Sequence, residues 1–122
     1  MGKYVLKVKE TGAAKFNLVA RNGEVIGVSE TYTSEKAARN GIESVKKNAL
    51  VAEVEDQTVA DYAVQKHPKF EVFTDKSGEF RFRLKARNGQ IVAVSEGYTT
   101  KPKCLNGIES VKKNAPDAEI VK

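Results

Sequence analysis

Few side chains in this sequence could act as acids, bases or nucleophiles, and they do not form a recognisable catalytic group. The sequence holds one histidine, His67, and one cysteine, Cys104. A proline follows His67 and biases it to an extended conformation in a connecting stretch, whereas Cys104 falls on an apolar helical face. These two side chains alone cannot form a zinc site, and no glycine-rich phosphate loop is present. The sequence therefore predicts a non-catalytic protein without a cofactor or a metal site.

A Ser-Glu pair occurs twice and ends in Glu30 and Glu96. If symmetry brought these two glutamates together, they could resemble the paired carboxylates of acid–base catalysis. Lys15 and Arg81, however, are expected opposite Glu30 and Glu96 across the neighbouring strands, where pairs of opposite charge stabilise a sheet. We therefore favour two structural cross-strand ion pairs over a catalytic pair.

The strongest candidate for binding is a basic strand in the second half of the chain. Residues 80–87 alternate between apolar side chains and cations, which is typical of a strand with one buried and one open face. The candidate binding face comprises Phe73, Arg81, Arg83, Lys85, Arg87, Val92 and Val94. The matching outer positions of the first half are Lys7, Lys15, Asn17, Val19, Arg21, Ile26 and Val28.

The register of this face depends on two turns. A two-residue type I′ turn at Asn88-Gly89 predicts that Val92 lies beside Lys85. A three-residue loop in the preceding hairpin predicts that Phe73 lies beside Arg81. Both predictions place apolar side chains among the cations.

Basic residues among apolar and aromatic ones suit a platform for single-stranded nucleic acid. Only one clear aromatic side chain lies on the face, however, and no RNP-type motif is present. Glu71 and Glu96 are expected to neutralise Arg83 and Arg81, which would leave weak, non-specific binding. The pattern is equally that of an ordinary solvated face, with long basic stems lying over valines.

Three hypotheses therefore remain open. The first is a module that binds an anionic partner, either nucleic acid or an acidic protein. The second is a protein-interaction or structural module that uses the same face or a sheet edge. The third and least supported is an enzyme.

The elements that position these residues occur twice. Residues 16–49 align without a gap with residues 82–115, and 21 of the 34 aligned positions are identical. Such a repeat indicates one supersecondary unit used twice. Each half alone would bury too little surface, so the halves are expected to share one core. We interpret residues 1–122 as a single domain with a first repeat at 1–55, a linker at 56–69 and a second repeat at 70–122.

Each repeat reads as three strands, a helix and a short fourth strand. The predicted strands are 4–8, 14–21, 24–30 and 52–55 in the first repeat, and 70–74, 80–87, 90–96 and 118–121 in the second. The helix between the third and fourth strands has apolar residues at helical spacing. Gly41 and Gly107 lie in mid-helix, where glycine costs ~1 kcal/mol relative to alanine, so we expect a close approach to the helix backbone there.

The repeated motifs are Ala-Arg-Asn-Gly, Ser-Glu-x-Tyr and the helical run Asn-Gly-Ile-Glu-Ser-Val-Lys-Lys-Asn-Ala. With these motifs the chain resembles the YegP-like family of small bacterial proteins. The resemblance implies an α+β fold in which two tandem β3-α-β repeats are related by pseudo-twofold symmetry. The repeats would form one antiparallel sheet with two helices on one face and would exchange their last short strands. The resemblance implies no activity and no functional residues.

The net charge of +5 is unevenly distributed. Residues 1–61 carry nine Lys/Arg and nine Asp/Glu, whereas residues 62–122 carry twelve and seven. A basic half suggests an anionic partner, although a charge of this size also serves solubility. No apolar run approaches the ~18 residues of a membrane span, and the first residues lack the features of a signal peptide. We expect a monomeric, cytoplasmic protein that does not bind membranes.

Overall fold

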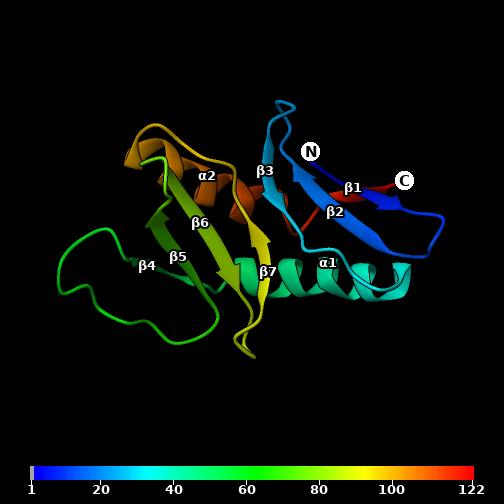
Figure 1. Cartoon of the computed structure of the whole chain (residues 1–122), viewed down its shortest axis with the longest axis horizontal. Helices are drawn as coiled ribbons and strands as arrows, with labels where there is room; N and C mark the ends of the chain where they lie inside the picture. The colour runs from blue at the N-terminus through cyan, green and yellow to red at the C-terminus, as the bar shows by residue number, and fades with distance from the viewer. Residues whose placement is uncertain (1) are drawn as a thin grey trace.

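The computed structural model describes residues 2–122 and shows two helices lying against one face of a sheet (Figure 1). The first repeat contains β1 (Lys3–Val8), β2 (Ala14–Val19), β3 (Val25–Val28), α1 (Glu35–Ala49) and β4 (Glu53–Asp56). The second repeat contains β5 (Lys69–Thr74), β6 (Phe80–Lys85), β7 (Ile91–Val94), α2 (Lys101–Asn114) and β8 (Glu119–Val121). The order of elements matches the sequence prediction, and the α+β class is confirmed.

Within residues 2–122 the eight strands form one sheet in the order β4-β5-β6-β7-β3-β2-β1-β8. The last strand of each repeat lies beside the first strand of the other, so the predicted exchange is confirmed. The sheet is not antiparallel throughout, because β4 pairs in parallel with β5 and β8 in parallel with β1. Parallel neighbours cannot be joined by a tight hairpin. The long linker after β4 is the connection that carries the chain back to the start of β5 (Figure 1).

The buried side chains of both repeats form one hydrophobic cluster between the helices and the sheet. The predicted inner face is confirmed, because Phe16, Leu18, Phe82 and Leu84 are all at most 1% exposed. The repeats meet in the middle of the sheet, where β3 and β7 pair only at Val28 and Val94.

The two Asn-Gly turns differ from the prediction in a way that changes the open face. In the second repeat, the Gly89 N–H donates to the Ala86 carbonyl and the Ala86 N–H donates to the Gln90 carbonyl, which gives a three-residue loop. Gly89 alone adopts a positive φ, of 85°, as expected for a type I turn followed by a bulge rather than a type I′ turn. The register therefore shifts after Leu84, and Lys85 pairs with Ile91.

This shift moves Val92 off the open face. Val92 is 6% exposed and belongs to the core, so the prediction that it lies beside Lys85 is wrong. The first repeat shows the same bulge between Leu18 and Val19, and Ile26 is likewise buried, at 2% exposure. The extra loop residue and the bulge place Ile91, rather than Val92, opposite Lys85 at the start of β7.

The mid-helix glycines do mark a close approach, as predicted. A Cβ atom on Gly41 would overlap the Tyr32 hydroxyl, and one on Gly107 would overlap the Tyr98 hydroxyl. Each tyrosine ring also stacks on a core phenylalanine, Phe16 or Phe82. Glycine is therefore retained in the helix because it leaves room for the tyrosine ring.

Candidate binding face of the sheet

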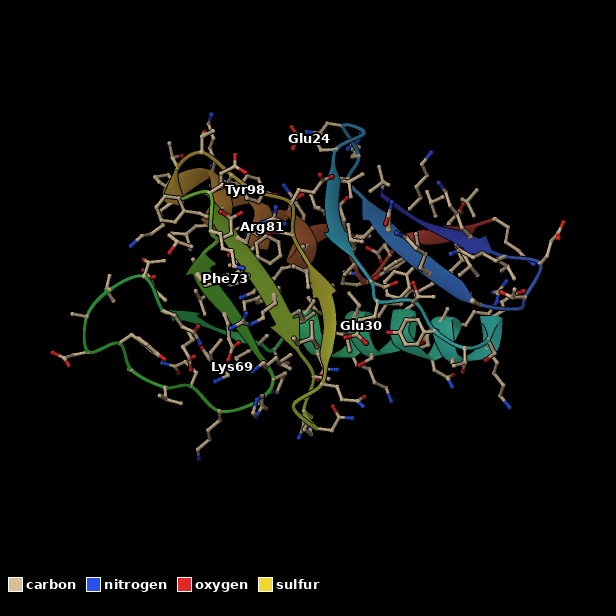
Figure 2. All side chains as sticks on the ribbon, in the orientation of Figure 1. Glu24, Glu30, Lys69, Phe73, Arg81 and Tyr98 are labelled. Atoms are coloured by element: carbon tan, nitrogen blue, oxygen red, sulfur yellow. The ribbon has the colours of Figure 1, made fainter. Side chains whose placement is uncertain are left out.

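The face of the sheet that is turned away from the helices carries Phe73 and Arg81 of the predicted binding residues (Figure 2). Phe73 pairs with Arg81, and Arg83 pairs with Val94, as the sequence predicted. Arg87 lies beyond the end of β6 in the exposed turn, so it does not continue the row of cations along the strand.

Arg81 is neutralised, but not by the predicted partner. Its Nε donates to Asp75 Oδ2 at 2.7 Å, and its guanidinium also donates to the Ser95 carbonyl at 3.2 Å. Hydrogen bonds from Arg81 and Ser77 lower the pKa of Asp75 well below its ordinary value. The predicted cross-strand pairs of Arg81 with Glu96 and of Lys15 with Glu30 are absent from the ion pairs among residues 2–122.

Arg83 and Lys85 share the carboxylate of Glu71. Arg83 Nε lies 2.5 Å from Glu71 Oε1, and Lys85 Nζ lies 3.1 Å from Glu71 Oε2. The Arg83 guanidinium also lies over the Phe73 ring, 4.3 Å from its centroid, in a cation–π contact. The sequence predicted the Glu71–Arg83 pair, whereas the contact of Lys85 with the same carboxylate is a finding of the structure.

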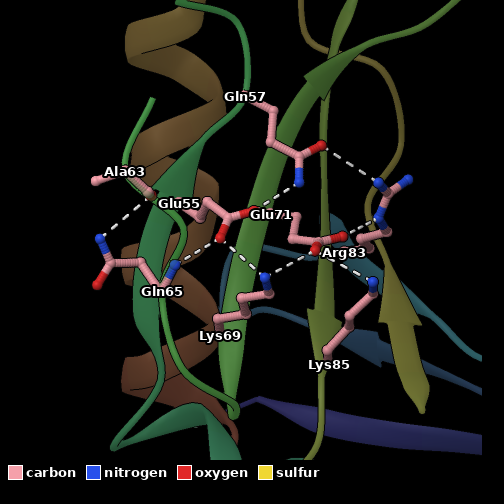
Figure 3. Close-up of polar contacts among 8 residues, drawn as sticks. All are labelled: Glu55, Gln57, Ala63, Gln65, Lys69, Glu71, Arg83 and Lys85. Atoms are coloured by element: carbon pink, nitrogen blue, oxygen red, sulfur yellow. Dashed lines mark hydrogen bonds and ion pairs between the residues drawn. The ribbon is translucent and has the colours of Figure 1, made fainter. Parts of the chain in front are cut away.

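A buried ionic network continues from Glu71 towards the edge of the sheet (Figure 3). Lys69 Nζ lies 2.8 Å from Glu55 Oε1 and 3.3 Å from Glu71 Oε2. Glu55, Lys69 and Glu71 are 2%, 6% and 3% exposed. Glu55 also accepts hydrogen bonds from the Gln57 side chain and from the Gln65 backbone N–H, so the network holds the linker against β4.

The network keeps its groups charged despite their burial. Burial alone would raise the pKa of Glu55, but the hydrogen bonds from Lys69, Gln57 and Gln65 lower it to about 2. Burial likewise opposes ionisation of Glu71, and hydrogen bonds from the cations around it lower its pKa. The hydrogen bond to Glu55 raises the pKa of Lys69. The basic strand β6 is therefore part of a compensated network rather than a row of free cations.

Strand exchange also redistributes the charge. Residues 1–52 together with 117–122, which pack as one half, carry ten Lys/Arg and seven Asp/Glu. Residues 53–116, which form the other half, carry eleven and nine. The charge asymmetry along the sequence therefore nearly disappears in space, because β4 brings acidic residues to the strands of the second repeat.

The cations without such compensation lie on the first repeat. Lys7 on β1 stands directly opposite Lys15 on β2, and Lys9 follows at the end of β1. None of the ion pairs among residues 2–122 involves these lysines. They line a hollow of about 310 Å³ together with Val8 and Thr31. We call Lys7, Lys9 and Lys15 the lysine patch.

Sequence reasoning ranked the second repeat above this patch, although the signal was present. At the offset of 66 residues, the acidic positions Glu71 and Asp75 correspond to Val5 and Lys9. The first repeat therefore lacks the carboxylates that neutralise the second. The sequence analysis did not foresee the Arg81–Asp75 and Lys85–Glu71 pairs, so it favoured the half whose cations are neutralised.

The two glutamates of the Ser-Glu motifs do line a common cleft, of about 410 Å³, where β3 meets β7. Val28 pairs with Val94 in antiparallel register, and each glutamate follows two residues later in its own strand direction. Glu30 and Glu96 are therefore separated by four residues along the strands, ~13 Å at ~3.3 Å each. They lie on opposite sides of the junction rather than side by side.

The two serines of these motifs have structural hydrogen bonds. Ser29 Oγ accepts the Phe16 N–H at 2.8 Å, and Ser95 Oγ accepts the Phe82 N–H at 2.9 Å. Each hydroxyl donates to the carbonyl of the following glutamate. The serines thereby link the end of each third strand to the second strand of its own repeat.

The remaining reactive side chains are far apart in the fold. Cys104 is fully buried in the core, and burial raises the pKa of its thiol to about 11. His67 lies on the exposed linker, next to Gly89. Among residues 2–122 no group of three or more His, Cys, Asp or Glu side chains could hold a metal ion. No helix in this range is long and apolar enough to cross a membrane.

A family model described as a domain of unknown function, DUF1508, matches residues 10–56 and again residues 75–121. The chain belongs to the DUF1508 family. It is 39% identical over 118 residues to a UPF0339 protein of Pseudomonas aeruginosa, an alignment that covers 97% of this chain and 94% of that protein. A UPF0339 protein of Treponema denticola is 64% identical over 53 residues, 43% of this chain and 91% of that protein.

The fold of this DUF1508 protein is similar to that of YegP from E. coli, a protein of unknown function whose structure was solved by solution NMR. The TM-score is 0.77 at 34% identity, and the match covers 98% of this chain and 90% of YegP. The resemblance to the YegP-like family and the two-repeat architecture are thus confirmed. The Treponema relative corresponds in length to a single repeat. The family is of unknown function, so function must be argued from the site.

Proposed function

We propose that this DUF1508 protein is a non-catalytic module that binds an anionic partner on the open face of its sheet, with the lysine patch as the main contact. The observation that carries the proposal is the cross-strand pair of Lys7 and Lys15, which face each other with no acidic partner. Like charges directly opposite each other destabilise a sheet by tenths of a kcal/mol up to ~1 kcal/mol. An anion placed between them would remove this repulsion.

Comparison of the two repeats supports the assignment. The positions of Lys7 and Lys15 are taken in the second repeat by Phe73 and Arg81, and there Arg81 is bound to Asp75. One half of the face thus neutralises its cations internally, and the other half leaves them available. The second-repeat residues Phe73, Arg81, Arg83, Lys85 and Val94 are proposed as a flanking surface with a smaller share of the binding energy.

The proposed partner is a polyanion rather than a small anion, because Lys9 follows two residues after the Lys7–Lys15 pair and would contact a second anionic group. Single-stranded nucleic acid is the most informative probe, since its phosphates give a defined salt dependence. For each phosphate contact the slope of log K against log salt changes by ~0.7. Loss of three contacts should therefore reduce the slope by ~2.

The test is a titration of a fluorescent single-stranded DNA, and in parallel of poly-glutamate, at low salt. The variant is Lys7→Glu/Lys9→Glu/Lys15→Glu. Its matched control is Lys36→Glu/Lys66→Glu/Lys76→Glu, which changes the net charge equally at exposed lysines outside the open face. We expect the patch variant to lose binding and the control to keep most of it. Equal losses in both variants, or no binding of either probe by the wild type, would overturn the proposal.

A further inference from the structure

A polar groove runs between the β2–β3 turn of the first repeat and helix α2 of the second. It consists of two adjoining hollows of about 440 Å³ and about 380 Å³, which share Asn22 and Ser110. Figure 2 labels Glu24 at the tip of the turn and Tyr98 at the approach to α2, and both line the larger hollow. The groove needs residues from both repeats, and it lies away from the lysine patch.

The groove has an excess of cations and of hydrogen-bond donors. Arg21 and Lys113 line the smaller hollow, and Lys103 lines the larger one opposite a single carboxylate, Glu24. None of these four side chains takes part in the ion pairs among residues 2–122. The charges of the groove are therefore available to a ligand.

Neutral donors complete the lining. Ser110 Oγ accepts a hydrogen bond from the Asn114 side chain at 3.2 Å, so its own proton remains available. The Tyr98 hydroxyl lies above Gly107 and has no hydrogen-bond partner among residues 2–122. Asn106 is exposed at the same wall. This combination suits a ligand that is rich in acceptor oxygens.

The pseudo-equivalent position, between the β6–β7 turn and α1, is built differently. There the Arg87 N–H donates to Asn48 Oδ1 at 3.3 Å and ties the turn to the helix. The corresponding hydrogen bond from Arg21 to Asn114 is absent within the described residues. Ala37 stands at the position of Lys103 and Gln90 at that of Glu24, so this counterpart lacks both charged side chains of the larger hollow. The chain therefore contains its own control site.

We propose that the groove between the β2–β3 turn and α2 binds a small phosphorylated, hydroxylated molecule such as a sugar phosphate. The phosphate would lie between Arg21 and Lys113, where a guanidinium can form paired charge-assisted hydrogen bonds. The hydroxyl groups would lie in the larger hollow, against Glu24, Tyr98 and Asn106. The combined size of the hollows falls in the range of small-ligand sites, ~300–1,000 Å³.

At the C-terminal end of α2, an anion can be bound only by cationic side chains. The groove lies beside the last turn of the helix, whose partial negative charge opposes an anion. Lys112 and Lys113 in that turn offset the dipole. The phosphate would therefore be held by Arg21 and Lys113 and not by the helix itself, so removal of either cation should lower the affinity about tenfold.

The test is an amide NMR titration of the full chain with ribose 5-phosphate, ribose and inorganic phosphate at physiological salt. Ribose 5-phosphate should shift the amides of residues 20–24 and 103–114 and leave those of 86–90 and 37–48 unchanged. Arg21→Ala and Lys113→Ala should each weaken binding about tenfold, whereas the matched Arg87→Ala and Lys47→Ala should not. The affinity of Arg21→Lys, which keeps the charge but loses the guanidinium group, should lie between those of the wild type and Arg21→Ala.

Each other result counts against the proposal. If ribose binds as well as ribose 5-phosphate, the phosphate site is wrong. If inorganic phosphate binds as tightly, there is no site for the hydroxylated part. Equal losses in the Arg21 and Arg87 variants, or no shifts in the groove with ribose 5-phosphate, would also overturn it. Because the lysine patch is intact in all these variants, failure here leaves the proposed function unaffected.

Discussion

Replacement of Glu55 by glutamine tests the buried network directly. The variant Glu55→Gln keeps the shape of the side chain and one acceptor oxygen, but it removes the charge that faces Lys69. The difference between a pKa of 4.5 and one of about 2 corresponds to ~3 kcal/mol at neutral pH. The remaining amide oxygen can still accept the Gln65 N–H, which offsets part of this, so we expect a loss of ~2 kcal/mol at pH 7.

The pH dependence of this loss identifies its origin. The folded-state pKa of Glu55 lies below its unfolded value, so the stabilisation is fully present above pH ~4.5 and is lost as the pH falls towards 2. The wild type and the Glu55→Gln variant should therefore differ by ~2 kcal/mol in free energy of unfolding at pH 7, and the difference should shrink steadily below pH ~4.5. Urea unfolding followed by circular dichroism measures both quantities.

The matched control for this experiment is Glu53→Gln, two residues away on the same strand. Glu53 is exposed and has no ion pair among residues 2–122, so its change should alter stability by less than ~0.5 kcal/mol. An effect of Glu55→Gln that stays constant from pH 7 to pH 3 would refute the electrostatic reasoning. So would an equal effect of both substitutions.

Three further outcomes are expected. Gly107→Ala should lower the free energy of unfolding, measured in urea, by ~1–3 kcal/mol, because the added Cβ would overlap the Tyr98 ring. Alanine is favoured over glycine in helices, so a gain in stability would contradict this packing. The thiol of Cys104 should resist iodoacetamide at pH 8 in the folded protein and react after unfolding. Cys104→Ala should lower the free energy of unfolding by ~1 kcal/mol. The fragment 66–122 should be a dimer or unfolded, as measured by light scattering and circular dichroism. The last strand of each repeat pairs with the first strand of the other, so β8 of the fragment would need β5 of a second copy. A stable monomer would contradict the shared core.

The sequence allowed most of the fold to be predicted because the relevant signals are local and occur twice. Alternation placed Phe82 and Leu84 on the inner face, and the loop before β6 placed Phe73 beside Arg81. The bulges were missed because an Asn-Gly pair fits both a two-residue turn and the end of a three-residue loop. Only the hydrogen bonds of the flanking Ala86 distinguish the two-residue turn from the three-residue loop. The sequence analysis therefore missed that Val92 is buried in the core.

The candidate face was harder to predict because its charges are paired by residues from distant parts of the chain. Glu55 belongs to the first repeat, yet strand exchange places it beside Lys69 of the second. A charge count along the sequence assigns this carboxylate to the wrong half. The pairing of charges in a strand-exchanged sheet can be judged only after the edge strands have been placed.

The two repeats have the same order of elements but differ in the charges on their open faces. Strand β4 of the first repeat lies beside β5 of the second and leads into the long linker, and the ionic network of Glu55, Lys69 and Glu71 binds that linker to the sheet. At the other end of the sheet, where β8 lies beside β1, the positions of Glu55 and Glu71 are taken by Val121 and Val5. The carboxylates of this network are therefore missing from that end of the sheet. Lys7, Lys9 and Lys15 have no ion-pair partner among residues 2–122, and this difference between two copies of one unit is the physical basis for proposing the binding surface on the first.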